Sequence, residues 1–155
     1  MQELDLQQLQ ERWSRLIQQF PGQKRDLLER AGQQILQRLR SAIGGTGKVA
    51  SWQDMSMGSK GGYVAVRPRK DTYQMTGSGT RYAVGYITNA IENGHRNRRP
   101  QPSGKADYRY RARIHHAATP GRHFYYSVRQ QLGQVGDREL RQLAQEILEE
   151  LGGQG

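Results

Sequence analysis

Apolar residues recur every three or four positions through the first 43 residues of the chain, and this spacing constrains the fold more than any other feature. In residues 4–20 the intervening positions are mainly Gln, Glu and Arg. This predicts an amphipathic helix whose apolar positions are Leu6, Leu9, Trp13, Leu16, Ile17 and Phe20. Pro21 and Gly22 are expected to end that helix.

A second helical run follows, which Gly44 and Gly45 are expected to stop. Its apolar positions are Leu27, Leu28, Ala31, Ile35, Leu39, Ala42 and Ile43. The sequence therefore predicts a pair of N-terminal helices within residues 4–43. Their apolar stripes are expected to face the core, with packing against a neighbouring subunit as the alternative.

A small antiparallel sheet is expected next. Residues 48–57 and 62–67 predict two strands, the second from valines that alternate with residues of the opposite face. The Ser59-Lys60-Gly61-Gly62 stretch suits a hairpin turn between them. The run that starts at Pro68 breaks the second strand, and residues 76–80 read as a flexible glycine-rich loop.

Two helical regions are predicted in the rest of the chain. A short helix over residues 82–93 is expected to end at Asn93-Gly94 in a left-handed cap. Pro120-Gly121 then turns the chain into a helical region over residues 122–151. Gly133 and Gly136 are expected to interrupt this region, and Asp137 is expected to cap its restart.

The arm between these helical regions, residues 95–119, is strongly basic. Between His95 and His123 the chain has eight basic residues and one acidic residue, within a total net charge of +10. An extended loop is expected up to Lys105. A strand should follow, with Tyr108, Tyr110, Ala112 and Ile114 on one face and Arg109, Arg111 and Arg113 on the other. Because like charges on one face repel, an acidic surface is expected opposite the arginines.

These elements predict a single α+β domain over residues 1–155. We expect a small antiparallel sheet packed by an N-terminal helical pair and a C-terminal helix, with a long basic loop and strand as an arm. The expected order is N-terminal helices 4–43, sheet region 48–76, short helix 82–93, basic arm 95–119 and C-terminal helical region 122–151. Only 34% of the residues are hydrophobic, so the core is small and partners outside the chain are expected, self-association being the commonest.

The sequence argues against catalytic, cofactor and metal chemistry. The Gly44–Lys48 stretch lacks the first glycine of a phosphate-binding loop and the Ser or Thr after its lysine. There is no cysteine, and no clustered carboxylates complete a metal site with the histidines His95, His115, His116 and His123. Glu92 lies three residues before His95, but no nucleophile or paired acid accompanies them. No apolar stretch is long enough for a membrane span, and the polar N-terminus is unlike a secretory signal, so a cytoplasm-like setting is expected.

The basic arm with its interleaved tyrosines leaves three interpretations open. It is a solvated charged loop, a protein interface, or a nucleic-acid-binding module in residues 96–113, since arginines bind phosphates and aromatic rings stack on bases. The candidate interaction residues are Arg96, Arg98, Arg99, Arg109, Arg111, Arg113 and Arg122.

Three short stretches resemble the tail-component family of long-tailed bacteriophages, which are small neck or tail-completion proteins. The stretches are Tyr82-Ala83-Val84-Gly85, then Thr88-Asn89-Ala90-Ile91-Glu92-Asn93-Gly94-His95, then Pro120-Gly121-Arg122-His123-Phe124. The order of the predicted elements is similar along nearly the whole chain. The chain departs from the family pattern after the second helix, where Gly44-Gly45-Thr46-Gly47 replaces a proline-threonine-glycine sequence.

The resemblance implies an α+β subunit without catalytic residues that assembles into a homo-oligomeric ring. Its implied partners are the head-side connector or adaptor protein and the tail tube or tail terminator protein, with at most a passing contact with DNA and none with a membrane. The implied location is the neck or tail of the virion, after synthesis in the bacterial host cytoplasm.

Two further expectations concern individual residues. Tyr82, Ile87 and Phe124 occupy apolar positions beside turns and are expected to be buried and structural. The arginines of the predicted strand are expected to dock on an acidic protein surface, because a neck lumen lined with arginine would hold the phosphates of passing DNA.

Overall fold

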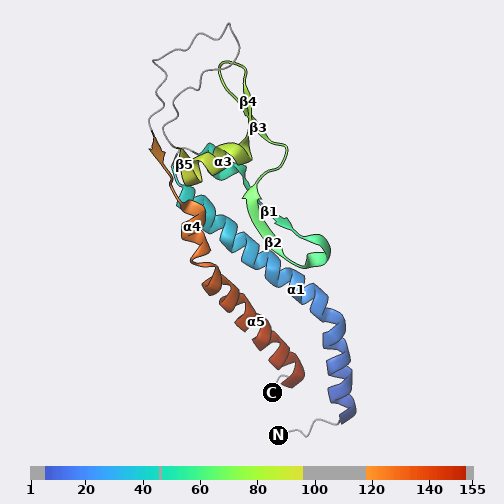
Figure 1. The fold of residues 1–155 in the computed structure, drawn as a ribbon. Coiled ribbons are helices and arrows are strands. Elements are labelled where there is room, and N and C mark those ends of the chain that lie inside the picture. The colour runs from blue at the N-terminus through green and yellow to red at the C-terminus, as the bar shows by residue number, and fades with distance from the viewer. Residues whose placement is uncertain (1–5, 46, 96–117, 153–155) are drawn as a thin grey trace, which may run out of the picture.

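The computed structural model describes residues 6–45, 47–95 and 118–152, and it is a mixed helix and strand structure, which confirms the α+β class. The molecule is elongated (Figure 1). Two long helices, α1 (Leu6–Ile43) and α5 (Leu132–Gly152), run antiparallel along it, and the strands and short helices lie along the C-terminal half of α1 and around its end. None of the described helices is long and apolar enough to cross a bilayer.

The predicted N-terminal helical pair is wrong, because α1 continues through Pro21 as one helix of 38 residues. Proline removes one backbone hydrogen bond and crowds the carbonyl four residues earlier, which kinks a helix without necessarily ending it. Figure 1 shows α1 changing direction in its N-terminal half. Leu16 and Leu27, on either side of the proline, are both buried, and Leu16 is the one buried residue between Leu6 and Pro21.

The first predicted strand is half helix. Gly47 has a φ of 87°, and α2 (Lys48–Trp52) begins directly after it, so the strand β1 starts only at Gln53 and ends at Met57. β1 pairs antiparallel with β2 (Val64–Pro68), which confirms the hairpin. The turn contains a short 3-10 helix, Ser59–Gly61.

The predicted loop of residues 76–80 is the turn of a second hairpin, whose two strands were not predicted from the sequence. The strands β3 (Tyr73–Met75) and β4 (Arg81–Ala83) pair antiparallel, and the Thr76 amide donates to the Thr80 carbonyl at 2.9 Å to close the turn. Hydroxyl groups of Thr76, Ser78 and Thr80 hydrogen-bond one another within it. Three-residue strands are too short for the alternation pattern to identify.

The short helix is confirmed as α3 (Val84–Asn93). Its cap differs from the prediction, since Gly94 has φ 72° and ψ −177°, a conformation open to glycine but outside the left-handed helical region. Gly94 instead begins a two-residue strand, β5 (Gly94–His95), which pairs with β6 (Thr119–Pro120). The predicted loop and arginine strand of the basic arm lie outside the described residues.

The C-terminal region contains two helices, but the break is not where glycines predicted it. α4 (Phe124–Arg129) is followed by the cap residue Gln130, whereas Gly133 and Gly136 both lie within α5. Glycine lowers helix stability by only about 1 kcal/mol. The packing of Val135 against the rest of the protein, with 2% of its surface exposed, outweighs that cost.

The core lies where α4 crosses the C-terminal end of α1. Leu39 and Ile43 of α1 pack with Phe124 and Val128 of α4. Further along, Glu139 of α5 is almost fully buried. Its carboxylate accepts hydrogen bonds from Arg30 at 2.8 Å and Gln34 at 2.5 Å, which fixes α5 on α1 in a single register.

The three residues that were predicted to be buried differ in their exposure. Phe124 is buried, as predicted, but Ile87 is half-buried and Tyr82 is exposed, so the prediction for Tyr82 is wrong. The ring of Tyr82, in β4, stacks on that of Tyr86, in the first turn of α3, with centroids 6.1 Å apart. The two rings therefore contact each other at the surface, where the sequence predicted that Tyr82 would be buried.

This difference gives a stability prediction. Phe124→Ala should lower the free energy of unfolding by about 3–5 kcal/mol, because it opens a cavity in the core. Tyr82→Ala should cost about 1 kcal/mol or less, because it removes a surface aromatic pair. Denaturant titration of the two variants measures both values, and equal losses would contradict the assignment.

Candidate interaction surfaces

The structure brings together the two halves of the sequence motif. Residues 92–95 and 119–124 are far apart along the chain, yet Gly94 pairs with Pro120 and His95 with Thr119. A β-carbon on Gly94 would overlap the backbone of residues 119–121, and one on Gly121 would overlap that of residues 92–93. Glycine is therefore required at both positions by the close approach of two backbones.

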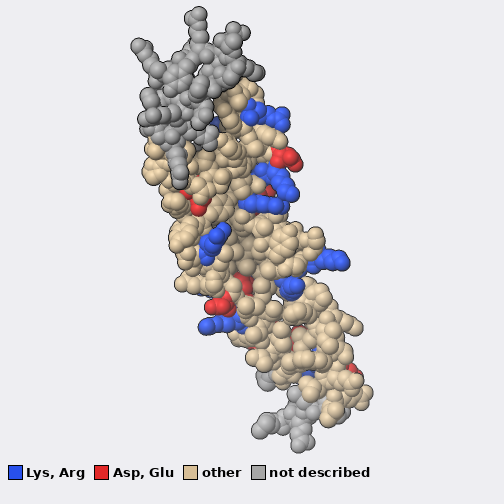
Figure 2. All heavy atoms as spheres, viewed as in Figure 1, with Lys and Arg blue, Asp and Glu red and all other residues tan. Residues whose placement is uncertain are grey.

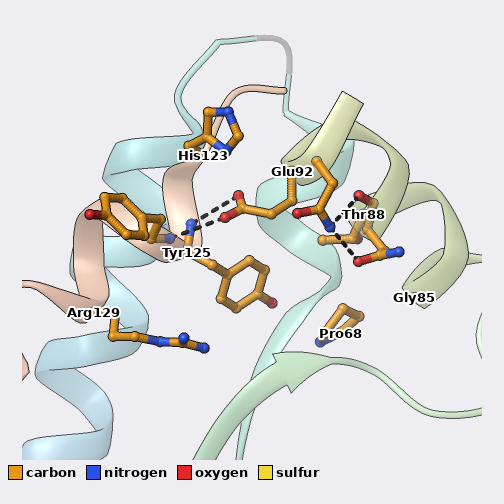
Figure 3. Close-up of a pocket in the computed structure, with 10 residues that line it drawn as sticks. Pro68, Gly85, Thr88, Glu92, His123, Tyr125 and Arg129 are labelled. Carbon is orange, nitrogen blue, oxygen red and sulfur yellow. Dashed lines mark hydrogen bonds between the residues drawn. The ribbon is translucent and has the colours of Figure 1, made fainter. Parts of the chain in front are cut away.

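Glu92 fastens this crossing to α4. It is a buried residue of α3, and its two carboxylate oxygens accept hydrogen bonds from the backbone amides of Tyr125 and Tyr126, at 3.0 and 3.1 Å (Figure 3). These amides lie in the first turn of α4, where backbone donors lack partners within the helix. The negative charge also faces the positive end of the helix dipole. Glu92 thus acts as a helix cap supplied by another element.

A second polar network lies beside this cap. The buried side chain of Gln53 donates to the Val49 carbonyl at 3.0 Å and accepts a hydrogen bond from the Tyr125 hydroxyl. Thr88 lies 3.4 Å from the same amide and donates to the Val84 carbonyl. Burial, followed by the nearby charge of Glu92, raises the pKa of Tyr125 to about 12. The network joins α2, β1, α3 and α4.

An open cavity of about 430 Å³ lies next to Glu92 and Tyr125 (Figure 3). Its polar lining is occupied with structural bonds: both Glu92 oxygens cap α4, and the Thr88 and Tyr125 hydroxyls are donated to Val84 and Gln53. Asn89, Asn93, His123, Tyr126 and Arg129 also line the cavity. The bonds of Glu92, Thr88 and Tyr125 are therefore bonds that stabilise the fold.

The candidate arginines have different outcomes. Arg122 lies in the described structure, and its guanidinium donates to the carbonyl of Ile43, the last residue of α1, at 2.5 Å. That bond satisfies a carbonyl at the end of the helix. Arg96, Arg98, Arg99, Arg109, Arg111 and Arg113 lie outside the described residues, so their role stays a prediction.

The β3–β4 hairpin and the start of α3 carry exposed side chains on two faces, together called the hairpin surface. The strand register places Tyr73, Met75 and Arg81 on one face, and Tyr82, which stacks on Tyr86, on the other. The four uncharged side chains are between 42% and 59% exposed. The guanidinium of Arg81 lies 3.8 Å from the Tyr73 ring centre. A two-stranded hairpin has little stability alone in water, so this surface is suited to a partner. This surface was not predicted from the sequence. The available signal was the alternation of Tyr73 and Met75 with Gln74 just before a glycine-rich stretch, which is typical of a hairpin strand.

A second exposed surface runs along the N-terminal half of α1. Five apolar side chains form this surface, here called the apolar stripe: Leu6, Leu9, Trp13, Ile17 and Phe20, with exposed fractions from 45% to 82%. All five belong to the first predicted helix, but they do not face the core of their own chain. The alternative kept for that helix, contact with another subunit, is the interpretation that this exposure favours.

Within residues 6–45, 47–95 and 118–152, no three acidic or histidine side chains gather closely enough to hold a metal ion. Comparison with known proteins finds no match for this chain among family models, curated proteins or solved structures.

The role of Glu92 can be measured by Glu92→Gln. The substitution keeps one acceptor oxygen but removes the charge and turns the amide NH2 group, a donor, toward a backbone N–H, so we expect it to cost about 1–2 kcal/mol of stability. Glu149→Gln changes an exposed carboxylate on α5 and should leave stability unchanged. Urea unfolding compares the two, and similar small losses would show that Glu92 is not a cap.

Tyr125 makes stability depend on alkaline pH. Because its pKa is raised to about 12 in the folded protein, from an ordinary 10, the unfolded chain loses this proton first and stability falls as pH rises from 10 toward 12. Tyr125→Phe should lose about 1–3 kcal/mol at neutral pH, since it leaves the buried Gln53 oxygen without a partner. The variant should show a smaller further loss above pH 10. Parallel stability curves for the two proteins would contradict this.

Proposed function

We propose that this protein is a structural virion subunit that assembles into a ring in the neck or tail-completion region of a tailed bacteriophage. The observation that carries the proposal is the exposure of large apolar and aromatic side chains at both ends of an elongated molecule. The apolar stripe lies at one end and the hairpin surface at the other (Figure 1). A ring of identical subunits requires two different surfaces that meet head to tail.

The energetics of these surfaces favour assembly on a template. Full burial of one large apolar side chain contributes roughly 1.5–3 kcal/mol, and association itself costs about 4–15 kcal/mol. A few such side chains per contact therefore give weak association between free subunits. A tail or connector that orients several subunits reduces this cost, so we expect rings to form mainly on that template.

The assignment to a phage rests on the resemblance of the sequence motif. A structural role of the motif residues is consistent with that assignment. Glu92, Gly94 and Gly121 hold a crossing of two chain segments and not a reactive site. The proposed partners are further copies of the chain, the head-side connector or adaptor, and the tail tube or terminator. We place the protein in the virion, after synthesis in the host cytoplasm.

Assembly can be tested by electron microscopy of the purified protein with and without tails or connectors. We expect rings on the template, and their loss when Tyr73, Tyr82 and Tyr86 are changed together to Ser. The melting temperature should change little, because these side chains are exposed. Tyr126→Ser is the matched control, since this tyrosine is 62% exposed on α4, outside the hairpin surface. A strict monomer at all concentrations, together with virions that lack the protein, would refute the proposal.

A nucleic-acid-binding module is the second candidate, favoured by the net charge of +10 and the basic residues 96–113. The variant Arg109→Gln, Arg111→Gln, Arg113→Gln separates the two functions. The ring proposal, with the arginines on an acidic protein surface, expects impaired assembly and little change in DNA affinity. Intact assembly with the loss of a strongly salt-dependent DNA affinity would favour nucleic-acid binding instead.

A further inference from the structure

The apolar stripe lies on a segment that makes little contact with its own chain. Between Leu6 and Asp26 the only buried residue of α1 is Leu16. Arg12 adds a single hydrogen bond, 3.1 Å from its guanidinium to the carbonyl of Leu151 near the end of α5. A helix of this length is marginal in water unless an apolar face is packed. The five side chains of the stripe supply that face, and in the isolated chain nothing described covers it.

The spacing of the stripe is symmetric about its central residue. Leu9 and Ile17 are each four positions from Trp13, and Leu6 and Phe20 are each seven positions from it. At 1.5 Å per residue, the outer pair lies about 10.5 Å on either side of the centre. If a second copy lies antiparallel, Trp13 meets Trp13 and every other stripe residue meets a large apolar residue. The stripe is therefore complementary to itself under a two-fold rotation.

The charges around the stripe permit such a pairing. Glu11 and Arg15 lie on the opposite side of the helix, given 3.6 residues per turn, and Arg12 is turned toward α5. The flank toward solvent presents Gln10 and Ser14, which are uncharged. Figure 2 shows few charged atoms over the lower end of the molecule, where this half of α1 lies. Two copies that each carry +10 can thus meet without placing like charges together.

The size of the stripe also fits a weak pair. Its five side chains expose on the order of 600 Å², which is somewhat below the roughly 800 Å² per partner of a standard interface. A patch of this size is at the upper limit of what monomeric proteins leave exposed. The contact is therefore large enough to be specific and small enough to be reversible.

We infer that the free protein forms a two-fold dimer in which the apolar stripe is covered by the same stripe of a second, antiparallel copy. A two-fold contact closes after two copies, so it does not build a ring. In relation to the proposed function, the dimer is the form that precedes assembly, and it opens when a template offers the stripe a different contact. The dimer itself does not depend on the protein being a phage component.

Site-specific cross-linking tests the geometry, because the natural chain has no cysteine. Single cysteines are placed by W13C, L6C and F20C, and a thiol cross-linker is chosen to match the roughly 8–10 Å between packed helix axes. W13C alone should give a covalent dimer. L6C and F20C should each give almost none alone, but should link when mixed. Strong self-linking of L6C would indicate a parallel pair, and the absence of linking in all samples would refute self-pairing.

The cysteine substitutions remove stripe side chains and could themselves weaken the dimer. Sedimentation of the natural chain therefore measures the association without them. The natural protein should sediment as a reversible dimer, and Trp13→Gln with Ile17→Gln should raise its dissociation constant at least tenfold. Leu148→Gln is the matched control, since Leu148 is 68% exposed on α5 and lies outside the stripe. Equal weakening by both variants, or a natural protein that is monomeric throughout, would overturn the inference.

The outcome for the dimer is separable from that for the ring. A covalent W13C dimer should fail to join rings until its cross-linker, chosen to be cleavable, is cut. If the dimer forms as described but no ring appears on any template, the proposed function fails and the dimer stands. If rings form on the template but the cross-linking pattern differs from that described, the dimer fails and the proposed function stands.

Discussion

The packing of α4 on the C-terminal end of α1 is the contact on which the rest of the structure depends. Phe124 and Val128 cover Leu39 and Ile43, and this small cluster is the main core of the protein. The contact also determines where the chain crosses itself, because α4 begins at the point where β5 meets β6. Apolar burial gives the contact its stability, and polar groups give it a fixed position.

Those polar groups come from elements that are distant in the sequence. Glu92 of α3 caps α4, Arg122 caps α1, and Gln53 joins α2 to the Tyr125 hydroxyl. Each of them satisfies a backbone group or a buried side chain that would otherwise lose its hydrogen bonds to water. A chain with a thin core gains from such bonds mainly specificity, since each one is compatible with only one arrangement of the helices.

The same thin core explains the exposed surfaces. Apolar side chains at the N-terminal half of α1 and on the β3–β4 hairpin are too far from the α1–α4 contact to join it, as the elongated shape shows. In an isolated monomer these side chains are exposed to water, which is unfavourable, and in an assembly they become the contact surfaces. The proposed dimer covers the apolar stripe alone, and the proposed ring then covers both the apolar stripe and the hairpin surface.

The sequence by itself determined the elements with long or strongly marked patterns: the helical character of residues 6–43, the β1–β2 hairpin, α3 and the C-terminal helices. It could not determine the outcome at Gly133 and Gly136, because the cost of a glycine in a helix, about 1 kcal/mol, is small beside the packing of side chains that are distant in the sequence. At Pro21 the helix bends without ending, and the sequence pattern does not distinguish a bend from an end. It identified Glu92, Gly94 and Gly121 as one motif without showing that they meet. Only the tertiary structure decided which apolar positions face inward, because periodicity defines a face of a helix but not what lies against that face.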